Sequence, residues 1–211
     1  GEAKKNFTDN PALSLSLSEK AKELSEKISD NVFIASSYHH LGISNYYLSD
    51  FSEAKEDFLK SLRIRKNLDH AEEIASSYIA LGNVYDMMAD YAKSAESNLE
   101  GLKIYEKLNE KDGIAKSLNN LGIVFWRQNN FEKSLQYHFK ALKIREETHD
   151  SAGIAYSLGN LGIVYNSMGE NSKDTSYLKK ALDYHLSSLK IIEENIGDKL
   201  WIGTSLNNIG T

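Results

Sequence analysis

The sequence predicts an all-α fold in which antiparallel helix pairs stack one after another into an array. The first observation is a repeat, because residues 114–147 reappear when the 211-residue chain is shifted by forty positions. Self-similarity at a period of roughly 20 to 50 residues is typical of repeat architectures. The second observation is the composition: one Pro, 41% hydrophobic residues, and no apolar run near the ~18 residues of a membrane span. The chain length therefore counts repeats, not globular domains.

The same residue types return at fixed positions in every copy. The copies begin at Ile34, Ile74, Ile114, Ile154 and, after a 48-residue step, Ile202. Further along, each copy has a glycine: Gly42, Gly82, Gly122, Gly162 and Gly210. A glycine inside a helix costs roughly 1 kcal/mol relative to Ala. Glycines in register therefore indicate that the paired helix, with small residues such as Ser94 and Ser134, approaches closely.

The chain before the first full repeat is predicted to hold one helix. Residues 1–9 are expected to be a flexible N-terminal segment outside the fold. A helix over 10–29 begins at Asn10-Pro11, with Asn as N-cap and Pro at the first helical position. Its pattern lies forty residues before that of 51–67, so this helix is phased like the second helix of a pair.

Each following repeat is predicted to contain two amphipathic helices joined by a short polar turn. We expect one solenoid domain over 10–211, with repeats at about 30–69, 70–109, 110–149 and 150–197 and a partial repeat at 198–211. First helices are expected at about 31–48, 71–88, 113–128, 151–168 and 199 onward, and second helices at about 51–67, 91–108, 131–147 and 178–195. Asp50 with Glu53 predicts a capping box, as does Asp69 with Glu72.

The fourth repeat carries seven additional residues at 170–176, in the expected turn between its helices. Insertions in repeat arrays map to loops on one face, which is often the binding face. We therefore expect a surface loop, with a contact loop for a partner as the alternative.

Several columns of the repeat resemble a known family. Leu-Gly is followed three residues later by an aromatic residue (Tyr85, Phe125, Tyr165), another aromatic opens the second helix (Phe51, Tyr91, Phe131), and two columns of small residues follow. The pattern resembles the tetratricopeptide repeat of the long, forty-residue type, similar to kinesin light chains, Leu-Gly-Asn repeat modulators and bacterial sensor regions. The common repeat has about 34 residues and usually a Pro near its end, which these units lack. The resemblance covers about 31–211 and implies a right-handed superhelix whose first helices line a concave groove.

Composition and motifs argue against several functions. The net charge of −5 disfavours direct nucleic-acid binding, which needs a basic stripe. Zero Cys excludes disulfides, thiolate metal sites and cysteine nucleophiles. Metalloprotease, phosphate-loop and nucleophile-elbow motifs do not occur. We therefore expect a protein that is not an enzyme and needs no cofactor or metal; it is expected to be soluble, in the bacterial periplasm or cytoplasm, with no membrane insertion in this segment.

Two histidines could be mistaken for ligands. His138 and His185 occupy one repeat position, which Phe58 and Asn98 fill in the other copies. A position shared with Phe and Asn indicates a residue that packs between helices.

A surface remains as the candidate site. On the first helices, positions not used for packing recur at spacings of three, four and seven, so they share one face. We predict that this face binds a peptide or helix of a protein partner, through the candidate residues His39, Tyr46, Asn83, Lys116, Asn119, Asn120, Trp126, Arg127, Tyr156, Asn160 and Asn208. The column Asn120, Asn160 and Asn208 can hold a peptide backbone, because a side-chain amide both donates and accepts.

The carboxylate clamp of the family, which grips an acidic chaperone tail, is not expected. Lys116 matches one of its positions, but Ile43 and Ala80 stand where Asn is needed and Asn120 where Arg is needed. Two alternatives stay open. One is a ligand- or peptide-sensing region of a bacterial sensor kinase, cyclase or transcription regulator. The other is self-association through the C-terminal end, where Leu206 and Ile209 have no second helix to cover them.

Overall fold

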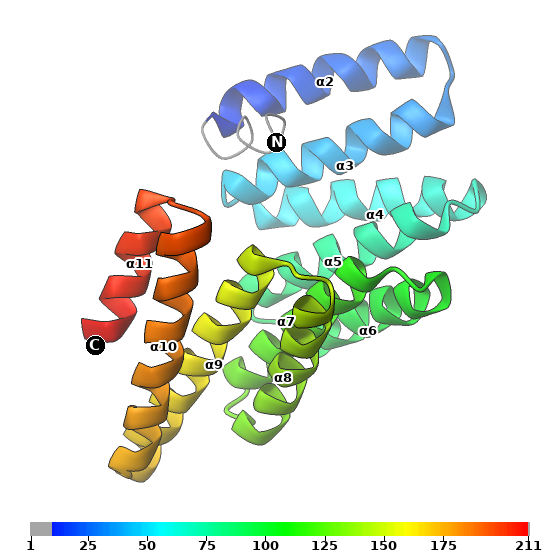
Figure 1. Ribbon diagram of the computed structural model, residues 1–211. Helices are drawn as coiled ribbons and strands as arrows, with labels where there is room; N and C mark the ends of the chain where they lie inside the picture. The colour runs from blue at the N-terminus through cyan, green and yellow to red at the C-terminus, as the bar shows by residue number, and fades with distance from the viewer. Residues whose placement is uncertain (1–9, 211) are drawn as a thin grey trace. The chain divides into compact units, whose positions relative to one another are not determined.

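The computed structural model describes residues 10–210, and every regular element in that range is an α-helix (Figure 1). The chain divides into two compact units, the first ending at Asn109 and the second beginning at Glu110. The first unit contains α2 (Pro11–Lys27), α3 (Asn31–Tyr47), α4 (Phe51–Asn67), α5 (Ala71–Met87) and α6 (Tyr91–Leu108). The second contains α7 (Lys111–Arg127), α8 (Phe131–Glu147), α9 (Ser151–Ser172), α10 (Thr175–Asn195) and α11 (Lys199–Gly210). The predicted segment 1–9 lies outside the described residues.

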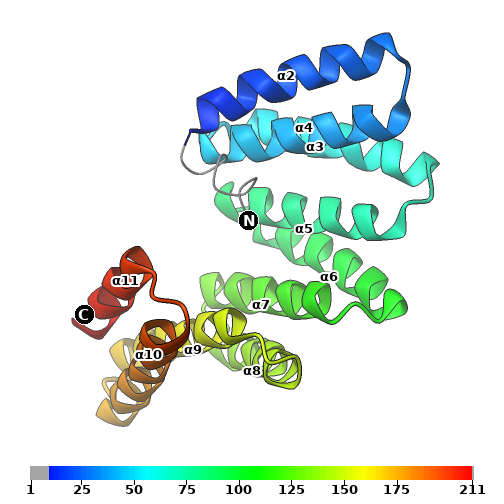
Figure 2. The same ribbon diagram turned by 45° about the horizontal axis from the view of Figure 1, so that its top comes forward.

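Packing within each unit confirms the predicted array of helix pairs. Within each unit, every helix packs against the next one along the chain, and the first helices of adjacent repeats also touch, α3 with α5 and α7 with α9. The hairpins are visible from two directions in Figures 1 and 2. As expected from its phase, α2 packs on α3 like the second helix of a pair. Among residues 10–210, no helix has both the length and the apolarity that a membrane crossing requires.

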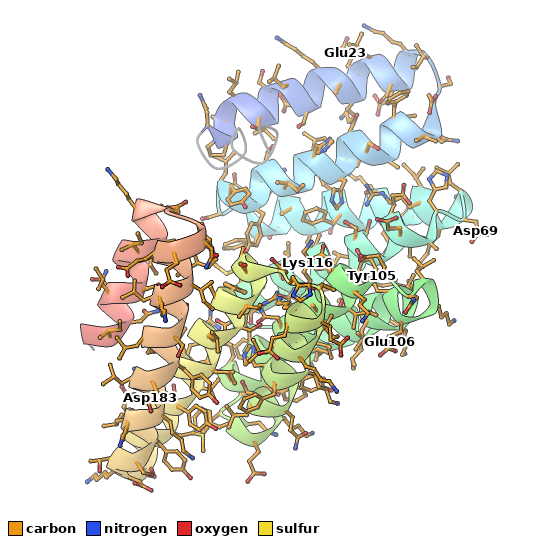
Figure 3. All side chains as sticks on the ribbon, in the orientation of Figure 1. Glu23, Asp69, Tyr105, Glu106, Lys116 and Asp183 are labelled. Carbon is orange, nitrogen blue, oxygen red and sulfur yellow. The ribbon has the colours of Figure 1, made fainter. Side chains whose placement is uncertain are left out.

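Short turns separate the helices and fix the length of the repeat. One residue in each turn takes the left-handed conformation: Ser29, Ser49, Asp69, Ala89, Asn109, Asn129, His149, Lys173 and Gly197. In the first eight turns, the next residue is the N-cap of the following helix. The predicted capping boxes are not formed. Asp50 is the N-cap of α4 but makes no side-chain cap bond, and Asp69, at φ 55° in the turn labelled in Figure 3, precedes the actual N-cap, His70. Left-handed geometry carries the chain around the turn at Asp69, so its carboxylate does not cap α5.

The glycine column marks close helix contacts, as predicted, but the residue that faces it is large. A Cβ built on Gly122 would lie 2.6 Å from Cε1 of His138, and one on Gly42 would lie 2.8 Å from Cδ1 of Phe58. His138 is 1% exposed and Phe58 is 2% exposed. The rings therefore lie flat on the glycine backbone, which confirms His138 as a packing residue.

The small residues of the second helices make a second contact across each pair. Ser134 Oγ donates to the Gly122 carbonyl at 2.8 Å, and Ser94 Oγ donates to the Gly82 carbonyl at 2.7 Å. In the α3–α4 pair a serine makes the same kind of bond: Ser61 Oγ on α4 donates to the Ala35 carbonyl on α3 at 2.7 Å. Carbonyls bonded in this way lie on the partner helix, so these small hydroxyls fix the separation of the two backbones.

The additional residues 170–176 do not form a loop, so the expectation of a surface loop is wrong. They lengthen both helices of the fourth repeat, so that α9 reaches Ser172 and α10 begins at Thr175. Seven residues are close to two turns of about 3.6 residues each, so the added length keeps the same face toward the partner helix. The longer hairpin is packed by Tyr165, whose ring stacks on Tyr177 and Tyr184 at centroid distances of 6.2 and 5.5 Å.

Candidate partner-binding surface

The first-helix face is defined here as the eleven candidate residues named from the sequence, and it is described separately in the two units. In the first unit it contains His39, Tyr46 and Asn83. His39 is half-buried on α3, with its ring edge against Phe58 at 5.2 Å and its Nδ1 3.1 Å from Nη1 of Arg65. Burial, reinforced by the charges of Arg65 and His40, lowers the pKa of His39 to about 3. The imidazole is therefore neutral at pH 7 and accepts a hydrogen bond from the arginine.

Tyr46 and Asn83 differ in how much surface they offer. Tyr46 is half-buried and makes edge contacts with Tyr47 and Phe51, both at 5.7 Å between ring centroids. Asn83 is exposed on α5. In the first unit, packing against α4 thus uses most of Tyr46, while the amide of Asn83 reaches the solvent.

In the second unit, two asparagines and a histidine form a hydrogen-bonded group. Asn119 is 1% exposed, and its Oδ1 accepts from Nδ2 of Asn160 at 2.9 Å. The same oxygen lies 3.2 Å from Nδ1 of His138, which donates to it as the neutral tautomer that this contact requires. Burial, with the charge of Arg145 as a smaller cause, lowers the pKa of His138 to about 4. Asn119 therefore lies beneath the surface and positions Asn160, which is half-buried above it.

Trp126 is the large aromatic residue of this face. It is half-buried on α7, and its Nε1 donates to Oγ of Ser167 on α9 at 2.8 Å. The guanidinium of Arg127 lies 5.3 Å from the indole centroid, within the range of a cation–π contact. Lys116, labelled in Figure 3, is exposed on the same helix and pairs with the carboxylate of Asp112. The indole is thus fixed between two first helices with part of its surface open.

Tyr156 is 45% exposed and is supported from below by a buried arginine. The guanidinium of Arg145 lies 5.7 Å from the ring centroid, and its Nη1 donates to the Gly153 carbonyl at 2.9 Å and to Ser157 Oγ at 2.7 Å. Arg65 does the same in the first unit, donating to the Glu73 carbonyl at 3.0 Å and Ser77 Oγ at 2.7 Å.

These arginines were not singled out in the sequence. They fasten the second helix of one repeat to the first helix of the next. The signal was present, because Arg65 and Arg145 are eighty residues apart at one repeat position, which Tyr105 fills in the copy between them.

The asparagine column is only partly uniform. Asn120 on α7 and Asn208 on α11 are half-buried, like Asn160. The amide of Asn160 donates to Asn119 Oδ1 at 2.9 Å. A row of equivalent amides for a peptide backbone therefore stays a prediction.

A small cavity lies among α7, α8 and α9, within the second unit. Its volume is about 170 Å³, and it is lined by Ile123, Trp126, His138, Asn160, Ile163 and Val164. Ile123, Trp126, Asn160 and Ile163 are half-buried on the first helices α7 and α9, whereas His138 and Val164 are buried. Sequence reasoning could place the stripe but not the cavity, because the cavity depends on how far the His138 ring is drawn toward Asn119.

Within residues 10–210, no group of three or more His, Asp or Glu side chains is arranged so that it could hold a metal ion. The side chains of this face are mainly amides and aromatic rings, with a few exposed charges.

Stacked helix pairs and a glycine in each first helix, close to the side chains of the second helix, define a helical-repeat protein. A family model described as tetratricopeptide repeat matches residues 33–107 and 113–173. The chain belongs to the tetratricopeptide repeat family. No curated protein matches it.

Solved structures share this fold at low sequence identity. BtubC (BKLC) from P. vanneervenii is 20% identical, with a TM-score of 0.78 over 95% of this chain and 82% of its own. The apo form of RapI is 21% identical, with a TM-score of 0.71 over 95% of this chain and 74% of its own. A signal transduction ATPase with a tetratricopeptide repeat sensor, from Pyrococcus horikoshii, is 20% identical, with a TM-score of 0.62 over 98% of this chain and 35% of its own. At these identities the likeness concerns the fold.

Proposed function

We propose that this chain is a non-enzymatic protein-interaction module that binds an extended peptide or a helix of a protein partner through the part of the first-helix face in its second unit. The observation that carries the proposal is Tyr156, an aromatic side chain that is 45% exposed yet held in place over the guanidinium of Arg145. Rigid aromatic anchors that offer apolar area and a polar edge are enriched at protein interfaces. Membership of the tetratricopeptide repeat family supports the same conclusion.

The neighbours of Tyr156 supply the rest of a recognition surface. Asn160 lies four residues further along α9, so it shares a face with Tyr156 about one helical turn away. Trp126 is fixed to the same helix through Ser167. Because these side chains are already held, a partner loses little binding energy to ordering them.

A pull-down with matched variants tests the proposal. The baits are the wild-type chain, Tyr156→Ala on the first-helix face, and Leu186→Ala on the second helix α10, where Leu186 is 47% exposed. Both substitutions remove a similarly exposed apolar side chain, and circular dichroism establishes that both variants are folded. We expect a partner that is retained by the wild type and by Leu186→Ala and is lost from Tyr156→Ala. Equal loss from both variants, or from neither, would contradict binding at the first-helix face.

A sensory role is a second candidate. It is favoured by the similarity to the Pyrococcus horikoshii protein, which carries a tetratricopeptide repeat sensor. In that case the occupant of the same face is a signal peptide or small ligand, and the chain is part of a signalling protein. Recovery of a short peptide, not a folded protein, in the pull-down would favour this candidate.

Self-association is a third candidate, favoured by the apolar surface of α11. Leu200 is 83% exposed and Leu206 is 52% exposed on this helix. Light scattering at increasing concentration tests it, because pairing of copies predicts a rising mass that Leu206→Glu abolishes.

A further inference from the structure

We infer that the cavity lined by Ile123, Trp126 and Ile163 is an anchor pocket that receives one uncharged apolar side chain of the bound polypeptide, of the size of Leu, Ile, Met or Phe. This inference rests on the proposed function, because it names the residue class that the first-helix face selects. It does not follow from the family fold, since the cavity depends on residues particular to the third and fourth repeats.

The volume of the cavity sets the size of its occupant. An apolar cavity of about 150 Å³ in another protein holds a benzene molecule. The present cavity is similar, at about 170 Å³. A branched aliphatic side chain or a single phenyl ring therefore fits.

The walls of the cavity set the chemistry of its occupant. The side chains of Ile123, Ile163 and Val164 are hydrocarbon. Asn160 Nδ2 and His138 Nδ1, which belong to the lining residues, already bond Asn119 Oδ1. Trp126 Nε1 bonds Ser167 Oγ. A charged side chain entering here would lose water without gaining an ionic partner, which is strongly unfavourable.

His138 forms part of the lining without supplying a charge. It is 1% exposed, and burial holds its pKa at about 4, so the ring is neutral at pH 7. The ring also lies on Gly122, where even a methyl group would come within 2.6 Å of it. His138 therefore cannot move toward α7 to fill the cavity, and the space persists.

The position of the cavity matches that of the exposed face. Asn160 borders the cavity and lies one turn along α9 from Tyr156, a separation of about 6 Å at 1.5 Å per residue. Side chains two residues apart in an extended peptide point to the same side and span a similar distance, about 6.6 Å, since each residue adds about 3.3 Å. A peptide that covers Tyr156 can therefore place its anchor in the cavity.

The first test uses benzene as the probe and does not depend on any partner. Methyl NMR signals of Ile123 and Ile163 are followed while benzene is added to the wild type, to Ile163→Phe, which fills the cavity, and to Ile191→Phe, which adds the same bulk on α10. We expect saturable chemical-shift changes of these methyl signals in the wild type and in Ile191→Phe. In Ile163→Phe, the signal of Ile123 should not change. A second filled variant, Ile123→Phe, serves if Ile163→Phe does not fold. No saturable shift in the wild type would overturn the pocket.

The second test uses a random peptide library displayed on phage. We expect wild-type selection to enrich Leu, Ile, Met or Phe at one position, and replacement of that residue by Ala to weaken binding about 10- to 100-fold, the range expected of an interface anchor. Peptides that bind through Tyr156 without such an anchor would overturn the pocket and leave the proposed function standing. Peptides whose binding requires the pocket and is unaffected by Tyr156→Ala would instead contradict the broader face.

Discussion

The contact between Gly122 and His138 predicts opposite effects for two substitutions of the same kind. A methyl group at Gly122 would lie 2.6 Å from Cε1 of His138 and 2.7 Å from both ring nitrogens, closer than the 3.0 Å that real Cβ atoms respect. The His138 ring cannot easily move away from the added methyl group, because it is buried and hydrogen-bonded to Asn119. At Gly159 the nearest atom to the added methyl group is Ser188 Oγ at 3.7 Å, an ordinary contact. Gly122 is therefore crowded and Gly159 is not.

The magnitudes follow from two opposing terms. Overpacking costs about 1 to 3 kcal/mol, while Ala is favoured over Gly in a helix by about 1 kcal/mol. Gly122→Ala should therefore destabilise the fold by about 0 to 2 kcal/mol, and Gly159→Ala should stabilise it by about 1 kcal/mol. The two variants then differ by about 1 to 3 kcal/mol, or by about 2 to 12 °C in midpoint temperature at roughly 2 to 4 °C per kcal/mol.

Thermal unfolding followed by circular dichroism measures this difference, and a second background isolates its cause. In His138→Ala the clash is absent, so Gly122→Ala should now raise the midpoint as Gly159→Ala does. Equal shifts for Gly122→Ala and Gly159→Ala in the wild-type background would refute the reasoning. So would a loss of stability from Gly122→Ala that persists without the histidine ring.

Two further predictions concern buried polar groups. Arg65→Ala removes the donor to the Glu73 carbonyl and Ser77 Oγ, so it should lower the free energy of unfolding measured in urea by about 2 to 3 kcal/mol. The control Arg63→Ala, at an exposed neighbour, should change that free energy by no more than about 0.5 kcal/mol. Equal losses of stability would contradict the fastening role of Arg65. Between pH 6.5, about the pKa of the unfolded histidine, and pH 4, about the pKa of His138 in the folded chain, the unfolded chain binds a proton that native His138 does not. Stability therefore falls as the pH is lowered through this window, by up to about 1.4 kcal/mol per pH unit. His138→Asn, which copies Asn98 of the second repeat, should reduce the loss in unfolding midpoint between pH 7.5 and pH 4.5, and an unchanged loss would contradict this assignment.

The sequence was sufficient for the fold because the repeat supplies the same evidence several times. Helix positions, the close approach at the glycines and the packing role of His138 all follow from columns that recur every forty residues. The insertion at 170–176 was misjudged because seven residues nearly equal two helical turns. An insertion of that length can extend a hairpin without turning its packed face away, as Tyr165 and Tyr177 show.

The candidate site was predicted less completely. Asn119 and Asn120 are neighbours on one helix, and periodicity alone does not decide which of the two points inward. The structure buries Asn119 and leaves Asn120 half-buried. The support of Tyr156 by Arg145 joins two helices, so it could not be derived from the pattern of either one.

Site-specific photocrosslinking tests the central claim most directly. A benzophenone amino acid is placed at Tyr156 on α9 or at Leu186 on α10, two positions with exposures of 45% and 47%. Each folded variant is irradiated in an extract of the source cells, and the adducts are identified by mass spectrometry. If the first-helix face binds the partner, one polypeptide becomes crosslinked at position 156 and not at position 186. The same adduct at both positions, or an adduct at 186 alone, would contradict the account.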